Sequence, residues 1–316
     1  MFFQTPKRIA KTGDDLPAEG LVAFVWRMSG WHQVTTAALA LVVAGLAVVP
    51  LELQRRIVDD VLTDRDPTLL FVLAAAYLVT IVTSGALKLL LRLYQGWLSE
   101  SAIVYCRNHL VRLRGQRSDD DEGGTVVSIV NSEIETVGGF VGTGVSDPIS
   151  QLGILVAVVG YMVVVEPVIG LVSVVFLGPQ VILVPVIQRK LNALVEKRIG
   201  YLREISDDIA DGDTAGGDGF EQRTSRIYRN RVRYYAWKFL GKALLNFLNA
   251  AAPLMVLAVG GWMVIEGQTQ IGVVVAFISG FARMSDPLRD LIAYYRLYAQ
   301  TSVKHDMIAD WMRQRS

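Results

Sequence analysis

Residues 189–242 read RKLNALVEKRIGYLREISDDIADGDTAGGDGFEQRTSRIYRNRVRYYAWKFLGK and interrupt an otherwise apolar sequence. These 54 residues carry twelve Lys or Arg and eight Asp or Glu, so they are expected to lie in water. Uncharged runs flank them at 168–188 and 243–265, each long enough to cross the roughly 30 Å hydrocarbon core of a bilayer. The stretch is therefore predicted to be a large loop between two membrane spans.

The two ends of this loop are predicted to be helical. Residues 189–208 and 220–238 form the arms, and a cluster of glycines and acids at 211–219 separates them. At 1.5 Å per residue, arms of about twenty residues reach about 30 Å from the bilayer. The loop is thus predicted to be a helical hairpin whose tip can touch a soluble partner.

The overall composition is that of a membrane protein. Apolar residues make up 52% of the 316 residues and charged residues 19%, with a mean hydropathy of +0.38. The single cysteine, Cys106, excludes an internal disulfide, and the three histidines show no metal-ligand spacing. Residues 1–20 are polar, so no cleavable signal peptide is expected.

The remaining spans follow from the same pattern of uncharged runs. We place them at 34–53, 69–87 and 149–165, in addition to the two that flank the loop. A polar connection is expected at 54–68, because it holds three Arg and four Asp. The helix that begins the second span continues into water until residues 119–124, which creates a first hairpin at 94–136.

The sixth helix starts at Ile271, but only residues 271–282 are uncharged, which is too short to span alone. Arg283, Asp286 and Arg289 follow without a break. Either this polar face turns toward a bundle interior, where intramembrane charges mark a pathway, or the lower half already lies in the cytoplasm. On the first reading, Arg283, Asp286, Arg289 and also Asp147 line a cavity.

Residues 21–33 (LVAFVWRMSGWHQ) form a short amphipathic stretch with Trp26 and Trp31, which suits a helix lying along the membrane interface. The alternative is a disordered lead-in. Of the 31 Lys and Arg, 23 fall in the amino-terminal segment, the two hairpins and the tail, against three in the opposite loops. The positive-inside rule then predicts that both termini and both hairpins are cytoplasmic.

The predicted protein is all-α and polytopic, an integral protein of a bacterial inner membrane. Its parts are a polar cytoplasmic lead-in (1–20), an interfacial helix (21–33), a six-span domain (34–300) with cytoplasmic hairpins at 94–136 and 189–242, and a cytoplasmic tail (301–316).

Several short motifs carry a family resemblance. They are PLELQRRIVD (50–59), GTVVSIVNSE (124–133), Glu166-Pro167, Gly272 with Phe277, and Pro287-Leu288 followed by Gln300 and Ser302. Together with six spans, two long hairpins and an interfacial helix, they resemble the transmembrane domain of ATP-binding-cassette exporters of the six-span type, over nearly the whole chain.

The resemblance implies that a separate ATPase subunit supplies the energy for this chain. The 316 residues hold no G-x-x-x-x-G-K-[ST] phosphate loop, and the sequence stops where fused exporters enter their nucleotide-binding domain. No catalytic, cofactor or metal residue is expected in this chain. ATP and Mg²⁺ would be bound by a separate nucleotide-binding subunit.

The resemblance also implies coupling residues at both hairpin tips, at 121–128 and 207–215. The candidates are Gly124, Val126, Val127, Ser128, Asp207, Ile209 and Asp211. The second tip departs from the family, because glycines at 212–219 weaken a helix by about 1 kcal/mol each relative to alanine. We therefore expect an ATPase partner to grip mainly through the first hairpin.

Two classes of function remain. The first is a transmembrane (permease) subunit that forms a homodimer or heterodimer in the lipid bilayer and is driven by a separate ATPase. The second keeps the fold without ATP, either as a proton-coupled transporter or as a non-transporting membrane protein. The basic arm at 223–233 is explained by topology, so no nucleic-acid partner is expected.

Overall fold

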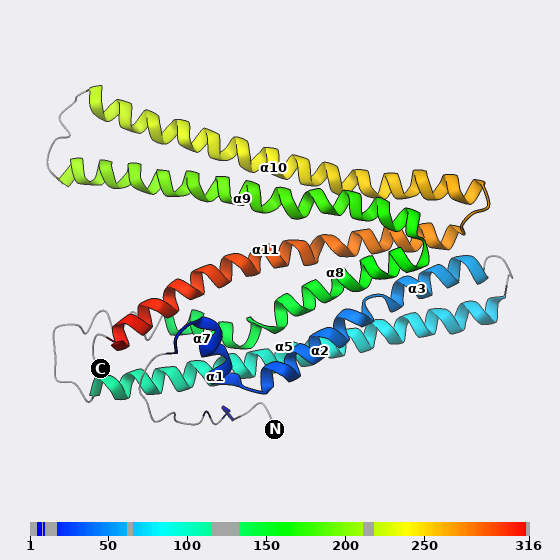
Figure 1. The fold of residues 1–316 in the computed structure, drawn as a ribbon, viewed down its shortest axis with the longest axis horizontal. Helices are drawn as coiled ribbons and strands as arrows, with labels where there is room; N and C mark the ends of the chain where they lie inside the picture. The colour runs from blue at the N-terminus through cyan, green and yellow to red at the C-terminus, as the bar shows by residue number, and fades with distance from the viewer. Residues whose placement is uncertain are drawn as a thin grey trace. The chain divides into compact units, whose positions relative to one another are not determined.

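The computed structural model describes residues 5–7, 9, 18–61, 66–115, 133–210 and 218–313, and every regular element in these ranges is helical (Figure 1). The chain divides into two compact units, which are described separately. Unit 1 is Met1–Val165 with Gln270–Ser316, and unit 2 is Glu166–Thr269.

Six helical stretches are long and apolar enough to cross a membrane, which confirms the predicted all-α, six-span protein. They are His32–Val61, Pro67–Arg112, Ile134–Val165, Pro167–Ser206, Phe220–Ile265 and Ile271–Arg313. The chain is an integral membrane protein.

Unit 2 is the predicted hairpin with its two spans. It consists of α9 (Pro167–Ala210) and α10 (Asp218–Ile265), which pack along each other (Figure 1). Gly241 allows close contact, because a Cβ there would lie 2.8 Å from Cδ1 of Ile187. Pro179 and Pro185 lie inside α9, and the helix continues through both.

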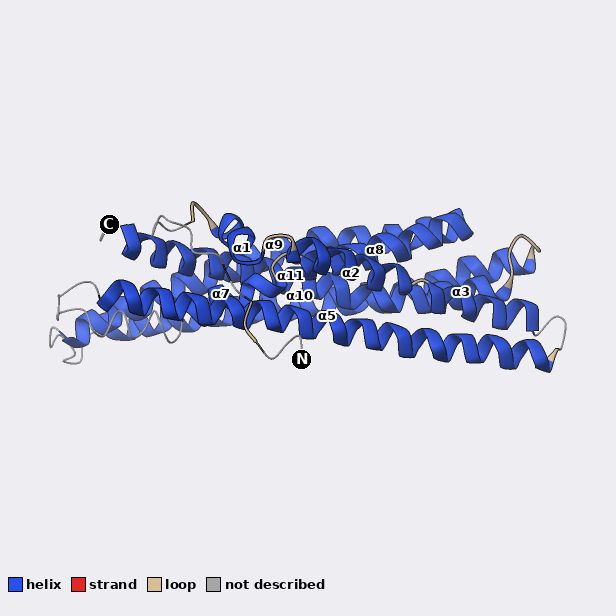
Figure 2. Cartoon of the chain, turned by 90° about the horizontal axis from the view of Figure 1, so that it is seen from below, coloured by secondary structure: helices blue, strands red, loops and turns tan. Residues whose placement is uncertain are grey.

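Unit 1 holds the other eight elements. They are α1 (Leu21–Ser29), α2 (His32–Leu46), α3 (Val49–Arg56), the π-helical turn η1 (Ile57–Val61), α5 (Pro67–Gly115), α7 (Ile134–Thr143), α8 (Ser146–Val165) and α11 (Ile271–Arg313). Within it, α7 packs on α5, α2 on α8, and α11 on α3 and α8. Figure 2 shows the same helices from a second direction.

Glycines spaced four residues apart bring α7 against α5. A Cβ on Gly138 would lie 2.5 Å from Cγ1 of Ile103, and one on Gly142 would lie 2.0 Å from the carbonyl oxygen of Gln95. Both distances are shorter than real contacts allow. This is the small-xxx-small arrangement that lets helix backbones approach in a membrane.

The helix that carries the first span extends beyond the predicted end of the span at residue 53. We expected a polar connection from Gln54, but helical structure continues through α3 and η1 to Val61. The charges do not end the helix because they pair along it: Glu52 lies 2.7 Å from both Arg55 and Arg56. Pro50 lies in the first turn of α3, where a proline fits without loss of a hydrogen bond.

The two ends of the chain also differ in detail from the predicted boundaries. The helix predicted at 21–33 ends at Ser29, because Gly30 adopts φ 55° and its amide donates to the Trp26 carbonyl. The next helix, α2, begins at His32.

At the carboxyl end, α11 runs unbroken to Arg313. Its last turns bury His305, Ala309 and Trp311, so 301–313 is a packed part of unit 1. Placement of α1 at a membrane interface stays a prediction.

Candidate functional site: an interrupted third span

The third span is interrupted in its first half. Helix α7 ends at Thr143 and α8 begins at Ser146, so Gly144 and Val145 lie between two helices of one span. A helix end leaves carbonyl oxygens without their usual amide partners. A carbonyl that is buried without a partner costs free energy, so donors from the protein are expected here.

Side chains from four different helices satisfy the carbonyls around this interruption. Ser99 Oγ of α5 donates to the Gly139 carbonyl at 2.8 Å, and Gln33 Nε2 of α2 donates to the Val141 carbonyl. Ser146 Oγ of α8 donates to the Gly142 carbonyl at 3.1 Å. The Tyr294 hydroxyl of α11 donates to the Gly144 carbonyl at 2.7 Å. The break is therefore an integral part of the bundle.

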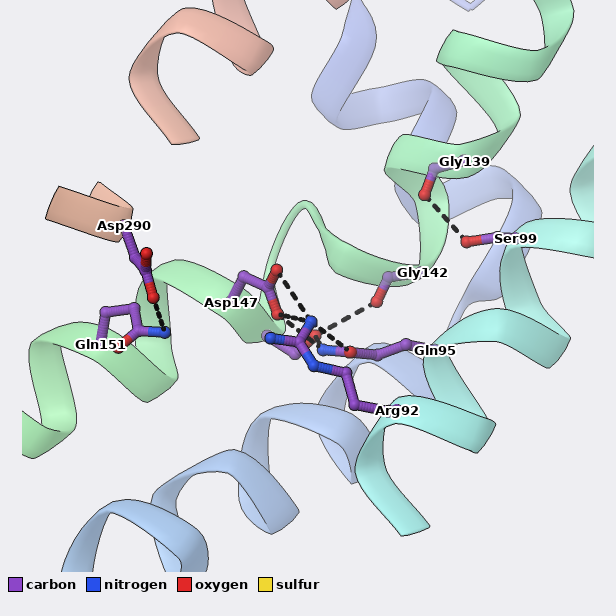
Figure 3. A network of polar contacts seen from close by, with 9 residues as sticks. Arg92, Gln95, Ser99, Gly139, Gly142, Asp147, Gln151 and Asp290 are labelled. Atoms are coloured by element: carbon purple, nitrogen blue, oxygen red, sulfur yellow. Dashed lines mark hydrogen bonds and ion pairs between the residues drawn. The ribbon is translucent and has the colours of Figure 1, made fainter. Parts of the chain in front are cut away.

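An ion pair lies at the start of α8, next to the interruption (Figure 3). Arg92 Nη1 lies 3.1 Å from Asp147 Oδ1, and Gln95 Nε2 donates to the same oxygen at 2.9 Å and to Ser146 Oγ at 2.7 Å. Gln95 is 1% exposed, whereas the Arg92 side chain is 60% exposed. Gln95 thus anchors Asp147 from the buried side, and Arg92 neutralises it from the open side.

A second polar contact joins α8 to α11 beside this ion pair. Gln151 Nε2 donates to Asp290 Oδ2 at 3.2 Å, one turn of α8 beyond Asp147 (Figure 3). Arg92, Asp147, Gln151 and Asp290 thus form a polar row contributed by α5, α8 and α11. We call these four residues the polar row.

The structure separates the four residues predicted to line a cavity. Asp147 belongs to the polar row. Asp286 and Arg289 pair with each other at 2.8 Å, and their side chains are 73% and 75% exposed. Arg283 is half-buried. Asp286 and Arg289 lie on the exposed side of α11, where no described contact joins them to Asp147.

The predicted coupling residues belong to the two hairpin tips. Gly124, Val126, Val127, Ser128 and Asp211 lie outside the described residues. Asp207 and Ile209 lie in the last turn of α9, where side chains are not described. Their role stays a prediction.

Sequence reasoning missed the residues that stabilise the interruption. Gln33, Gln95 and Tyr294 lie in helical segments that are otherwise rich in apolar residues, and their polar groups were the signal that was available. Buried polar side chains usually make hydrogen bonds, so a lone glutamine in a span indicates a partner.

A small apolar cavity lies elsewhere in unit 1, between α1, α5, α7 and α11. Its volume is about 80 Å³, and Phe24, Met28, Cys106, Val137 and Ile308 contribute to its walls. Ligand pockets for drug-sized molecules measure about 300–1,000 Å³. Among the described residues no group of three or more His, Cys, Asp or Glu is arranged to hold a metal ion.

Six membrane-spanning helices, a long helical hairpin and a polar row beside an interrupted span are the architecture of a membrane transport protein. The sequence matches the ABC transporter transmembrane region family over residues 34–208. This match covers more than half of the chain, so the chain belongs to that family. The resemblance inferred from the sequence motifs is confirmed.

One relative extends the similarity beyond the matched region. The chain is 21% identical over 285 residues to a Bacillus subtilis protein named "Putative multidrug export ATP-binding/permease protein YgaD". The aligned part covers 82% of this chain and 49% of that protein. The chain thus spans about half the length of this curated relative.

Proposed function

We propose that this chain is the transmembrane (permease) subunit of an exporter and that it works as a dimer whose alternating access is driven by a separate ATPase chain. The observation that carries the proposal is the family match over residues 34–208, which coincides with four of the six spans and the first arm of the hairpin in unit 2. The relative's printed name joins ATP binding to a permease.

The need for an ATPase outside these residues follows from the chemistry of nucleotide binding. Holding nucleotide phosphates requires a glycine-rich loop with a lysine, and the 316 residues hold no G-x-x-x-x-G-K-[ST] sequence. ATP and Mg²⁺ would therefore be bound by the partner. Force would enter through the hairpin tips, mainly at Gly124, Val126, Val127 and Ser128, and to a smaller extent at Asp207, Ile209 and Asp211.

The exposed charges of α11 support a dimer. Asp286 and Arg289 lie within a span-bearing helix, where a charge facing lipid costs about 2.5–3.5 kcal/mol on insertion scales. Facing a water-filled space between two subunits removes that cost. Arg283 and the polar row would contribute to the lining of the same space.

The interruption of the third span supports a role in the transport pathway. Discontinuous helices of transporters often lie beside the substrate site, and this interruption lies next to the ion pair between Arg92 and Asp147. Placement in a bacterial inner membrane with both termini cytoplasmic completes the proposal, and the distribution of Lys and Arg supports it.

The test is reconstitution in nanodiscs and proteoliposomes. The chain is purified alone and together with a candidate nucleotide-binding subunit. We expect ATP hydrolysis and vesicle accumulation of a fluorescent amphiphile only when both chains are present, and loss of both when the phosphate-loop lysine of the ATPase is replaced. Transport by this chain alone, driven by a proton gradient, would overturn the proposal.

A further inference from the structure

The small apolar cavity between α1, α5, α7 and α11 lies where two parts of the core of unit 1 meet. One cluster of buried apolar side chains includes Val137, and the other includes Leu110. Cys106 and Ile308 are half-buried, pack against both clusters and line the cavity. The cavity is thus an unfilled space at the junction of two core clusters.

The walls of this cavity are apolar on all four helices. Phe24 and Met28 come from α1, Leu110 from α5, Val137 from α7, and Ile308 and Ala309 from α11. Side chains around an empty space lose the van der Waals contacts that an occupant would supply. Apolar cavities stay dry and take up apolar molecules, so the interior of this cavity suits an alkyl group.

The size of the cavity limits what can enter it. Its volume is about 80 Å³. A cavity of about 150 Å³ takes up a benzene molecule, so roughly half that volume suits the last few carbon atoms of one alkyl chain. The two acyl chains of a phospholipid do not fit together in this space.

The mouth of the cavity is basic. Arg27, in the last turn of α1, lines the cavity and is exposed, so the cavity reaches the surface beside this guanidinium group. His109 and His305 also line it, and an imidazole N–H can donate a hydrogen bond to an anion. The planar fork of an arginine matches a carboxylate in shape and charge.

No acidic side chain competes for this position among the described residues that line the cavity, because none of them is Asp or Glu. Two acids that follow wall residues in the sequence have basic partners. Asp306 Oδ1 lies 3.3 Å from His305 Nδ1, and Glu135 Oε1 lies 3.5 Å from Arg107 Nη2. An apolar interior with a basic mouth is complementary to a molecule with an alkyl chain and an anionic head.

We propose that this cavity binds a fatty acid, with the end of its alkyl chain between the apolar walls and its carboxylate at Arg27. The binding requires neither ATP nor transport. A bound chain contacts α1 and α11 together, at the place where the rings of Phe24 and His305 lie 5.6 Å apart. The fatty acid therefore strengthens the attachment of α1 to the rest of unit 1.

The test is photo-crosslinking of the purified full chain in nanodiscs. The probe is octanoic acid with a diazirine near its methyl end, and octanol with the same diazirine is the neutral counterpart. Mass spectrometry of peptides locates the adducts after illumination. We expect the acid to label the walls, at residues such as Cys106, Val137 and Ile308, and unlabelled octanoate to compete for this labelling.

Two variants that fill the cavity should remove these adducts. Ala309→Leu and Ile308→Phe each occupy the space of the chain end, and burial of each methylene is worth about a factor of four in affinity, so labelling of the walls should fall about tenfold or more. Ala299→Leu is the matched control, because Ala299 is exposed on the same helix and lies outside the cavity. It should leave the labelling unchanged.

Arg27→Gln tests the head group. It should lower labelling by the acid about tenfold, since a hydrogen bond to a charged group is lost, and should leave labelling by the alcohol unchanged. Arg112→Gln removes the same charge from an exposed position of α5 outside the cavity and should change neither. Equal losses of the acid and alcohol adducts in Arg27→Gln would overturn the assignment of a carboxylate.

Thermal unfolding supplies an independent measurement of binding. A ligand that binds only the folded chain raises its melting temperature, so octanoate should stabilise the unmodified chain and Ala299→Leu but not Ala309→Leu or Ile308→Phe. The same unfolding curves show whether each variant is folded. Wall labelling that is equal in the filled variants and in Ala299→Leu, or adducts confined to the outer faces of the spans, would show that the acid only dissolves in the bilayer, and would overturn the proposal.

Discussion

Replacement of Gly142 by alanine should destabilise unit 1, and the structure sets the size of the effect. The new Cβ would lie 2.0 Å from the Gln95 carbonyl oxygen and 2.4 Å from Ser99 Oγ. Overpacking of this kind costs about 1–3 kcal/mol, and a backbone oxygen in the way places this case at the upper end. Alanine regains about 1 kcal/mol of helix propensity, which leaves a net loss of about 1–2 kcal/mol.

Gly139→Ala is the matched control for this prediction. Gly139 lies in the same helix, and a Cβ there would meet no atom within 4 Å, so only the gain in helix propensity applies. Both variants gain the same propensity, so the difference in stability between them isolates the clash with α5. The assay is thermal unfolding in detergent followed by tryptophan fluorescence. Equal melting temperatures for the two variants would show that α7 does not pack on α5 as described.

Three further predictions follow from the site and the hairpins. Tyr294→Phe leaves the Gly144 carbonyl without its donor and should cost about 1–3 kcal/mol, whereas Tyr298→Phe should cost much less; thermal unfolding of both variants compares them. Val127→Asp should abolish binding of an ATPase partner in a pull-down, because an unpaired carboxylate in an apolar cleft costs several kcal/mol, while Asp213→Ala should leave binding intact. An equal loss of ATPase binding in both variants would show that the partner binds mainly through the second hairpin. The purified chain alone should show no saturable ATP hydrolysis, which a coupled-enzyme assay measures directly.

The spans and the long hairpin were predictable because they depend on local composition. An apolar run of twenty residues has few alternatives to a membrane helix, and charged arms on both sides of residues 211–219 have few alternatives to a hairpin. The continuation of the first helix to Val61 was not predicted, for a related reason. Hydropathy counts Glu52, Arg55 and Arg56 as three separate charges, whereas in the helix both arginines lie 2.7 Å from Glu52 and pair with it.

The interruption between α7 and α8 had a signal in the sequence that we did not use, but the contacts that hold it could not be predicted. Pro185 and Pro287 lie inside continuous helices, whereas Pro148, in the first turn of α8, has no amide hydrogen to donate to the Gly144 carbonyl four residues earlier. Hydrogen-bond donors from four helices stabilise the carbonyls at the break. Their meeting at one place depends on the tertiary structure and cannot be read from the sequence. The hydrogen bond from the Gly272 amide to the Asp59 carboxylate shows the same limit. Asp59 and Gly272 were noticed as separate family landmarks, but their contact across 213 positions is visible only in the structure.

The continuity of α11 has a mechanical consequence. This helix has 43 residues, which at 1.5 Å each makes a rod about 65 Å long. One end of the rod is fixed to Asp59, and the other buries His305 and Trp311. A force applied near Arg313 is therefore transmitted along α11 to its first turn beside Asp59 as a displacement or rotation. Only bending at Pro287, where one backbone hydrogen bond is missing, reduces it. Stiffening that point with alanine should make the two ends move more nearly as one body.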